Sequence, residues 1–445
     1  MWGSKIGFIM AAAGSAVGLG NIWGFPTQVG QGGGAVFVLI YLVCVFFVCA
    51  PIFISELILG RGSKKGPVGA FESFAPQSAW WIVGALCVLC GVGILSFYAV
   101  IAGWTLAYIY FTAAGTLGGN AQEVAAAFGA FTANGAANLG LTAVFLAVTA
   151  GCILGGVRAG IERVTKTLMP LLIGLLLVLA VRAITLPGAS EGLRYYLRPD
   201  FSRLTDFNVL TAALGQAFFS LSLGMGALIT YGSYMRKQDN LAVSALWVVL
   251  LDTAIALLAG FIIFPTGFSI EGFDPSSSGP GLIFQVLPQL FATLPGGALF
   301  GAAFFILLAM AALTSTISLL EVPVSHCIDE YRWPRKKAVW LLTAGTFLLS
   351  IPSALGNGAV GRLSSMPAAL GGNFLGFMAL VWNQYALPIG GLLISIFVAY
   401  RLGLPKAIQE ITAEGAQFPY TNLWGFLIRF VSPVAIAIII ISSFL

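Results

Sequence analysis

The chain has 445 residues, of which 59% are apolar and 8% are charged. Charged residues make up about 25% of an average soluble protein, so this composition excludes a soluble domain and indicates a helical membrane protein that crosses the bilayer many times. The net charge is +5, but the basic residues lie in short segments between apolar runs, so we expect membrane lipid and no nucleic acid as partners.

Eleven apolar segments are long enough to cross a bilayer, which takes about 20 residues in a helix. They cover residues 5–28, 35–60, 78–113, 140–157, 165–186, 208–234, 243–267, 295–328, 337–356, 379–402 and 424–445. If the N-terminus is cytoplasmic, 16 of the 21 lysine and arginine residues lie on the cytoplasmic side, as the positive-inside rule requires. We therefore expect the N-terminus inside and, with an odd number of spans, the C-terminus outside.

The first span contains a stretch that should not stay helical, Gly14-Ser15-Ala16-Val17-Gly18-Leu19-Gly20-Asn21. Glycine costs about 1 kcal/mol relative to alanine inside a helix, and a backbone group freed in hydrocarbon costs several kcal/mol unless something satisfies it. A broken helix at this depth implies an ion, a ligand or a polar cavity. The sixth span has a similar interruption at Ser220-Leu221-Ser222-Leu223-Gly224-Met225-Gly226.

Interrupted helices five spans apart point to a site between two inverted repeats. The expected fold is therefore an all-α membrane protein of about 11 transmembrane helices, with a 5+5 inverted repeat in which helices 1 and 6 are broken at mid-membrane. The repeats would cover approximately residues 1–186 and 208–402 of a single domain, 1–445, and residues 424–445 would form an extra helix.

Three acidic residues lie inside spans, where ionisable groups mark functional sites: Glu56, Asp252 and Glu321. Asp252 lies near the centre of the seventh span, so a bound cation is the simplest partner for its carboxylate, with protonation as the alternative. Glu56 is expected to accept hydrogen bonds from backbone N–H groups freed by a broken helix. Glu321 lies toward the cytoplasmic end of the eighth span, and we expect it to reach water.

Hydroxyl groups in the spans have two interpretations each. Thr314 and Ser315 could bond to the preceding helical turn, or they could join backbone carbonyls in a neutral cage for a monovalent cation. Tyr98 could bind a substrate carboxylate or only a helix carbonyl, since a buried tyrosine hydroxyl needs a partner. The sequence has a single histidine and no phosphate-binding, zinc-protease or serine-hydrolase motif, so we do not expect an enzyme.

These stretches together resemble the neurotransmitter:sodium symporter family, in particular its bacterial amino-acid transporters of the leucine-transporter type. The resemblance covers essentially the whole chain, and its motifs are GSAVGLGNIW in span 1, GQAFFSLSLGMG in span 6, LTSTISLLEV in span 8 and LPIGGLL in span 10. It implies a multi-pass protein of the bacterial cytoplasmic (inner) membrane, a monomer or weak homo-oligomer. Such a protein carries a small-molecule amino acid together with two sodium ions by alternating access.

The resemblance also implies which residues hold the ions and the substrate. The first sodium site would use Ala16, Asn21, Ser220 and Asp252, and the second Gly14, Val17, Ala311, Thr314 and Ser315. The substrate would be bound by Ala16, Leu19, Gly20, Ile94, Tyr98, Phe219, Ser220, Ser222, Met225, Ser315 and Leu319, with Phe219 as a lid. Because the walls Ile94, Met225 and Leu319 are apolar, the implied substrate is a neutral hydrophobic amino acid.

Chloride is not expected as a further ion. Chloride-dependent family members carry Asn at the position of Asp252 and Ser one turn later, where this chain has Ala256. Two sodium ions and a zwitterion carry a charge of +2, which the Asp252 carboxylate lowers to +1 without chloride.

The outer gate departs from the family pattern. Gly24 replaces the usual arginine after the first break, and Ala379 stands where its aspartate partner is expected. Outer closure would then rest on Phe219 and on packing around Trp23 and Trp382. This departure leaves room for a symporter of a β-amino or sulfonated amino acid. Two rival functions on the same scaffold are a channel and a sodium-dependent receptor that does not transport.

The inner gate and hinge match the family in part. Tyr234 and Asp329 match the inner gate, but the arginine expected near the start is missing from this sequence, so either the N-terminus is trimmed or Lys5 substitutes. Gly160 and Pro170 match a Gly-x9-Pro pattern at the start of span 5. Glycine tolerates unwinding and proline cannot donate a backbone hydrogen bond. This segment is therefore expected to open as a hinge, with an ordinary N-terminal proline as the alternative.

Overall fold

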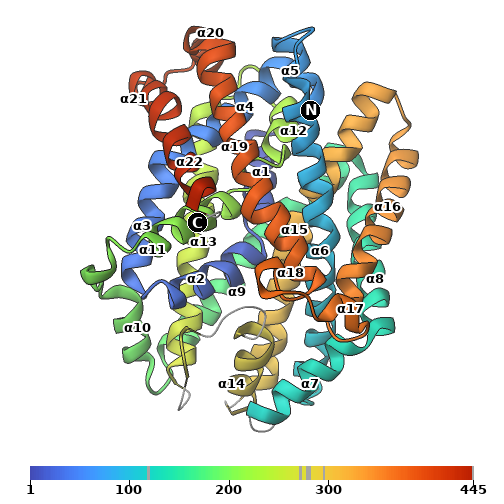
Figure 1. Cartoon of the computed structure of the whole chain (residues 1–445), viewed down its shortest axis with the longest axis vertical. Coiled ribbons are helices and arrows are strands. Elements are labelled where there is room, and N and C mark those ends of the chain that lie inside the picture. Colours follow the sequence, from blue (N-terminus) through green and yellow to red (C-terminus); the bar gives the residue numbers. More distant parts are fainter. Residues whose placement is uncertain (118–120, 270–272, 277–281, 294–295, 443–445) are drawn as a thin grey trace.

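The computed structural model describes residues 1–117, 121–269, 273–276, 282–293 and 296–442, and every regular element in these ranges is a helix. Most of the helices run along the long axis of the molecule (Figure 1). In this view the upper end carries the N-terminus, α5 (Pro67–Phe74) and α20 (Leu404–Ile411). The lower end carries α7 (Ala121–Ala133), α10 (Ala189–Leu197) and α14 (Leu287–Thr293).

Nine described helical segments are long and apolar enough to cross a membrane. They are Ala35–Ser63 (α3, η2 and α4), Trp81–Ala113 (α6), Gly135–Leu154 (α8), Val157–Ile184 (η3 and α9), Leu241–Gly267 (α13), Gly297–Tyr331 (α15), Arg335–Leu355 (α16), Phe374–Ile411 (α18 to α20) and Thr421–Ile441 (α21 and α22). The bent pair α1 (Lys5–Ala16) and Gly20–Gln31 (η1 and α2), with an angle of 50°, adds a tenth span.

The eleventh span is the second interrupted helix. Here α11 (Phe207–Ser220) and α12 (Ala227–Ser233) are separated by residues 221–226, which are not helical. The prediction of an all-α membrane protein with about 11 transmembrane helices, two of them broken, is therefore confirmed for the described residues.

Several boundaries differ from those expected. The fourth and fifth spans begin at Gly135 and Val157, earlier than residues 140 and 165, because their first turns contain the polar residues Asn138 and Arg158. The Asn134 side chain caps α8 by accepting a hydrogen bond from the Ala137 N–H at 3.1 Å. The connections 114–139 and 268–294 also contain helices, α7 and α14, that hydropathy alone does not predict. Parts of both connections lie outside the described residues.

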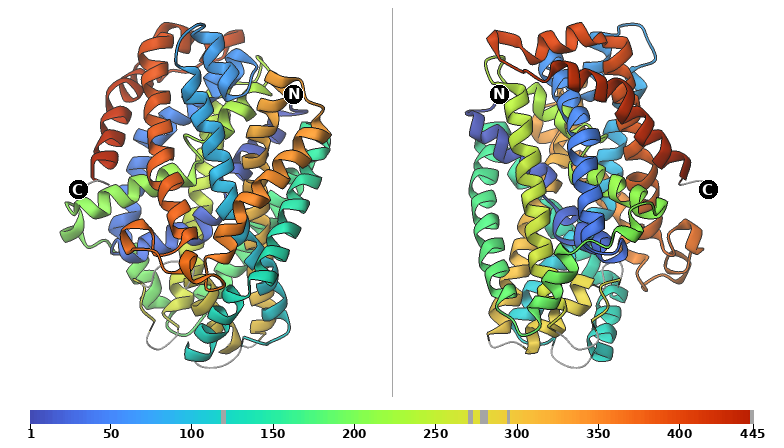
Figure 2. Two further views of the ribbon diagram at one scale, coloured as in Figure 1. Left: turned by 45° about the vertical axis from the view of Figure 1, so that its right-hand side comes forward. Right: turned by 90° about the vertical axis from the view of Figure 1, so that its left-hand side faces the viewer.

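The last two helices, α21 (Thr421–Phe426) and α22 (Ser432–Ser442), lie at the edge of the molecule in both views of Figure 2. Two side-chain hydrogen bonds attach them to the second span. The Trp424 indole donates to the Pro51 carbonyl at 3.1 Å, and the Ser432 hydroxyl donates to the Val48 carbonyl at 3.0 Å. This final span therefore packs on the outside of the bundle that holds the site.

Glycines allow α4 (Ala50–Ser63) and α12 to pack with their backbones in contact. A side chain at Gly60 would overlap the Ile229 carbonyl, and one at Gly232 would lie 3.1 Å from the Leu57 carbonyl. At the adjoining break, the Glu56 carboxylate accepts a hydrogen bond from the Gly224 N–H at 2.7 Å. Glu56 thus binds a backbone N–H freed by the broken sixth span, which is the contact expected of it.

Candidate functional site

The break in the first span leaves backbone N–H groups that side chains satisfy. Val17 ends α1 in an extended conformation, with φ −70° and ψ 110°. The Gly18 N–H then donates to the Asn21 side-chain oxygen at 3.1 Å, and the Leu19 N–H donates to the Tyr98 hydroxyl at 2.8 Å. Buried backbone groups need such partners in a membrane. Tyr98 therefore accepts from a freed amide, a partner that neither interpretation of this tyrosine foresaw.

Three side chains from three spans meet at a first group of oxygens, which we call the carboxylate site. The Asn21 amide donates to Asp252 Oδ1 at 2.7 Å and to the Ser220 hydroxyl oxygen at 2.9 Å. The Ser220 hydroxyl in turn donates to Asp252 Oδ2 at 2.8 Å, and the Tyr41 hydroxyl donates to Ser220 at 3.3 Å. Asp252 is fully buried.

No lysine or arginine pairs with Asp252 among the salt bridges of the described chain. Only neutral donors stabilise its carboxylate there. A buried charge is costly unless it is paired or coordinates a metal ion. Carboxylate and carbonyl oxygens suit hard cations, and unwound helix ends with free carbonyls coordinate sodium in transporters of this architecture. The carboxylate site therefore has the donor set of a site for a hard cation.

A second group of oxygens, the hydroxyl site, lies between the first break and α15. The Thr314 hydroxyl is 3.0 Å from the Ala311 carbonyl and 3.5 Å from the Val17 carbonyl. The Ser315 hydroxyl donates to the Val17 carbonyl at 3.2 Å. Gly14 lies against this group, because a side chain there would lie 3.1 Å from Thr314 Cβ. All of these oxygens are neutral, in contrast to the carboxylate site.

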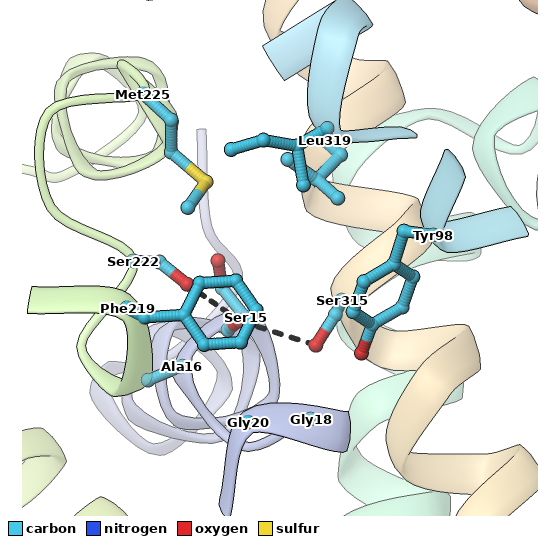
Figure 3. Close-up of a pocket in the computed structure, with 11 residues that line it drawn as sticks. Ser15, Ala16, Gly18, Gly20, Tyr98, Phe219, Ser222, Met225, Ser315 and Leu319 are labelled. Atoms are coloured by element: carbon cyan, nitrogen blue, oxygen red, sulfur yellow. Dashed lines mark hydrogen bonds between the residues drawn. The ribbon is translucent and has the colours of Figure 1, made fainter. Parts of the chain in front are cut away.

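A small cavity lies between the two breaks and adjoins the hydroxyl site through Ser315. It is lined by Ser15, Ala16, Gly18, Gly20, Ile94, Tyr98, Phe219, Ser222, Met225, Ser315 and Leu319. In Figure 3, Met225 and Leu319 point toward one another from opposite sides, and the Phe219 ring lies beside the first break. No lining residue carries a charge, so the cavity suits an apolar side chain. Leu19 and Ser220, which were expected to bind the substrate, are not among the residues that line it.

Hydroxyl groups tie the two breaks together at this cavity. The Ser222 hydroxyl donates to the Ser15 carbonyl at 2.9 Å, and the Ser315 hydroxyl lies 3.3 Å from the same oxygen (Figure 3). Ser222 has a φ of 54°, a left-handed backbone that non-glycine residues rarely adopt. Such strain concentrates at functional sites.

Two residues of the lining were missed in the sequence. The Ser15 hydroxyl is buried and has no hydrogen-bond partner within the described chain. A side chain at Gly18 would overlap the Ser315 hydroxyl and crowd Tyr98. Both residues lie in the glycine-rich break, and Ser15, Ala16, Gly18 and Gly20 of that break line the cavity. Their position in the break could therefore have identified them from the sequence.

Beside the first break, Gln216 takes part of the space that an arginine at position 24 would use. Its side-chain oxygen would lie 3.2 Å from a Cβ at Gly24, and its amide donates to the Gly20 carbonyl at 2.8 Å. Trp382 packs directly on Gly93, where any side chain would overlap the indole ring. Sequence analysis anticipated packing around Trp382 but missed Gln216.

The expectation that Glu321 reaches water is wrong. Its side chain is fully buried, pairs with Arg335 at 2.5 Å and accepts a hydrogen bond from the Tyr234 hydroxyl at 2.8 Å. The reason is that α15 continues to Tyr331 and the chain turns back at Arg332, which has a φ of 54°, so Arg335 returns over Glu321.

The other expected inner-gate contacts also differ. Asp329 accepts a hydrogen bond from the Gly66 N–H at 3.0 Å. Lys5 forms none of the salt bridges found among the described residues, so it does not replace the expected arginine partner of Asp329 here. The N-terminus is held instead by Trp2, which is fully buried and donates through its indole to the Tyr231 carbonyl at 3.0 Å.

The fifth span is helical throughout the expected hinge. η3 (Val157–Glu162) continues directly into α9 (Arg163–Ile184), and Pro170 lies inside α9. Gly160 has a second reason to be glycine, because a side chain there would overlap the Cys152 carbonyl at the end of α8. The segment is therefore wound into a helix in this structure, and Pro170, which has no N–H, removes one backbone hydrogen bond from α9.

Comparisons with known proteins agree with this geometry. The model of the sodium:neurotransmitter symporter family matches residues 1–121 and 119–445. The crystal structure of MhsT in complex with L-phenylalanine matches with a TM-score of 0.91 and 43% identity, covering 99% of each chain. The sodium-dependent transporter YhdH of Bacillus subtilis is 39% identical, and one from Haemophilus influenzae is 34% identical, each over 99% of this chain and 97% of the relative. The chain therefore belongs to the sodium:neurotransmitter symporter family.

Proposed function

We propose that this protein is a sodium-coupled symporter of neutral hydrophobic amino acids. The observation that carries the proposal is a cavity without charged lining residues that lies between two broken helices and beside two groups of oxygen donors. The similar protein MhsT, whose structure contains L-phenylalanine, supports an apolar amino acid as substrate.

The two oxygen groups suit two sodium ions. Asn21, Ser220, Asp252 and the Ala16 carbonyl would hold the first ion, and the carbonyls of Gly14, Val17 and Ala311 with the hydroxyls of Thr314 and Ser315 would hold the second. Sodium would displace hydrogen bonds that these groups make to one another, such as that from Asn21 to Asp252 at 2.7 Å. The Asp252 carboxylate supplies the negative charge that chloride supplies elsewhere, so transport is independent of chloride.

The substrate's amino and carboxylate groups would meet the backbone of the two breaks. Leu19 and Gly20 offer amides, Tyr98 a hydroxyl, and Ala16, Phe219 and Ser220 carbonyls. In this structure the Leu19 amide and the Tyr98 hydroxyl bind each other at 2.8 Å. A substrate carboxylate would exchange that internal hydrogen bond for its own contacts, and the apolar side chain would face Ile94, Met225 and Leu319.

Alternating access would move the broken helices against the rest of the bundle, as two inverted repeats of five spans. With the N-terminus in the cytoplasm, the upper end faces inward and the lower end outward, in the cytoplasmic membrane, and the C-terminus lies outside. Phe219, Gln216 and Trp382 would close the outward path. Trp2, Tyr234 and the pair of Glu321 with Arg335 would close the inward path.

The test is binding of an amino-acid panel to the purified protein in sodium chloride, potassium chloride and sodium gluconate, followed by uptake into vesicles. We expect phenylalanine and leucine to bind in both sodium salts and not in potassium. Binding of β-alanine or taurine in place of these would contradict the hydrophobic substrate. Sodium-dependent binding without uptake would identify a receptor.

A further inference from the structure

A buried carboxylate outside both oxygen groups holds the start of the chain. Glu162 lies where η3 meets α9 and is only 4% exposed. Its Oε2 accepts a hydrogen bond from the Gly3 N–H at 2.7 Å, and its Oε1 accepts one from the Ser4 hydroxyl at 3.1 Å. The Lys166 ammonium, one turn along α9, pairs with Oε1 at 2.6 Å. One side chain therefore joins the N-terminal segment to the fifth span.

The contact reaches the cap of α1 itself. Ser4 is the N-cap residue, and its hydroxyl oxygen accepts a hydrogen bond from the Gly7 N–H at 3.0 Å while the same hydroxyl donates to Glu162. At Gly7 any side chain would overlap the Glu162 carboxylate. Glycine at this position lets the first turn of α1 close around the carboxylate. The helix cap made by Ser4 and the contact between Glu162 and residues 3 and 4 are thus one hydrogen-bonded unit.

The same helix leads to the ion and substrate site. α1 ends at Ala16, and its last residues include Gly14 at the hydroxyl site and Ser15 at the cavity. On the fifth span, the Met169 sulfur would lie 3.4 Å from a Cβ at Gly14. Glu162 and Met169 therefore hold α1 at its start and near its end. Moving the start of this 12-residue helix changes the geometry of the hydroxyl site.

The charged contact at this gate is made by Glu162 and not by Asp329. Asp329 accepts from the Gly66 N–H and contacts no residue of the N-terminal segment through the hydrogen bonds described. Trp2 adds two neutral hydrogen bonds, from its backbone N–H to the Tyr234 carbonyl at 3.1 Å and from its indole to Tyr231. Hydrogen bonds to ionised groups are about twice as strong as neutral ones, so those to Glu162 are expected to be stronger than those of Trp2.

We propose that Glu162 is a positioning residue of the inner gate, whose carboxylate must release Gly3 and Ser4 before the upper half of α1 can move away from the fifth span. Its role in a transport cycle rests on the proposed function. Glu162 lies between Gly160 and Pro170, so local unwinding of this segment would withdraw the carboxylate from the cap. Opening of the hinge and release of α1 are then one event.

The test is hydrogen–deuterium exchange of the full-length protein in lipid nanodiscs, with and without sodium. In Glu162→Ala we expect the amides of residues 3–9 to exchange about tenfold faster, because charge-assisted hydrogen bonds protect them. Gly7→Ala leaves Glu162 in place and crowds it from the side of α1, so it should have a similar effect. Glu162→Gln keeps an oxygen acceptor, so the exchange rate of residues 3–9 in this variant should lie between the rates in Glu162→Ala and in the unmodified protein.

Two matched variants separate this role from general stability. Lys166→Gln removes the ion pair within α9 and should change exchange at residues 3–9 by less than about twofold. Asp329→Ala should leave residues 3–9 protected. The proposal is overturned if Glu162→Ala and Gly7→Ala leave residues 3–9 unchanged, or if exchange rises equally in α4 and α12. No substrate is needed, so failure of amino-acid binding would refute the proposed function without affecting this result.

Discussion

The two oxygen groups on either side of the first break differ in charge and in what holds them. The carboxylate site joins three spans through Asp252, which is fully buried and fixed by Asn21 and Ser220. The hydroxyl site joins α15 to the end of α1, through neutral oxygens at 3.2 to 3.5 Å. An ion bound at the first group would gain a full charge interaction, whereas binding of an ion at the second would depend on how closely α1 approaches α15. We therefore expect the hydroxyl site to lose its ion first when α1 moves.

The largest effect is expected where the charge is removed. Asp252→Asn eliminates the only carboxylate of the first group, and hydrogen bonds to charged groups contribute about 1.5–3 kcal/mol each. The sodium concentration for half-maximal phenylalanine binding should therefore rise about tenfold or more, or binding should acquire a requirement for chloride. Titrations with sodium chloride and sodium gluconate measure both.

Thr253→Val is the matched control for this substitution. Thr253 follows Asp252 on α13, and its hydroxyl only donates to the Val249 carbonyl at 2.8 Å. Its sodium titration should match that of the unmodified protein. If Asp252→Asn gave the same sodium titration as the unmodified protein, the Asp252 carboxylate would not be part of an ion site. Charge would then not distinguish the two oxygen groups.

A smaller effect is expected at the neutral group. Thr314→Val keeps the shape of the side chain and removes one hydroxyl ligand, which contributes about 0.5–1.5 kcal/mol. Sodium affinity should fall about two- to tenfold, with no new requirement for chloride. The measurement is the same titration of phenylalanine binding.

Thr316→Val provides the comparison for this variant. Thr316 lies on the same helix, but its hydroxyl pairs with Thr149 at 2.8 Å, away from the cavity. It should leave sodium affinity unchanged. If Thr314→Val weakened sodium as strongly as Asp252→Asn, charge would not distinguish the two groups.

The smallest effect is expected in the hinge beside the hydroxyl site. Pro170→Ala restores a backbone N–H inside α9 and should stabilise the helical form by about one hydrogen bond. Equilibrium binding should stay the same while uptake into vesicles slows about threefold. Pro352→Ala, inside α16 and outside the hinge, should change neither quantity. Faster uptake in Pro170→Ala would show that the fifth span does not open by unwinding.

The sequence was informative where the chemical signal is local. Glycines inside an apolar span located both breaks, and an isolated acid at position 252 indicated a polar site. The resemblance then named Asn21, Ser220 and Asp252 together, and the structure brings them within hydrogen-bond distance. Membrane helices are also easy to recognise, because a span must be apolar over about 20 residues.

Other contacts could not be predicted because they depend on how distant helices pack. Glu162 meets residues 3 and 4 only after spans 1 and 5 lie together. The sequence suggested that Glu321 reaches water, because apolar patterning does not show that the chain turns back at Arg332. This turn places Arg335 over Glu321. Gln216 was missed for a related reason, since nothing in its own span shows that it faces Gly20.

The close packing of α4 on α12 has a practical consequence for spectroscopy. Gly60 and Gly232 bring the two backbones together, and Glu56 anchors the break at Gly224. These two helices should move as one piece, so spin labels placed on their exposed ends should report one narrow distance in every condition. That distance is an internal reference, against which labels on α1 and α9 would measure how far the gate travels when sodium is added.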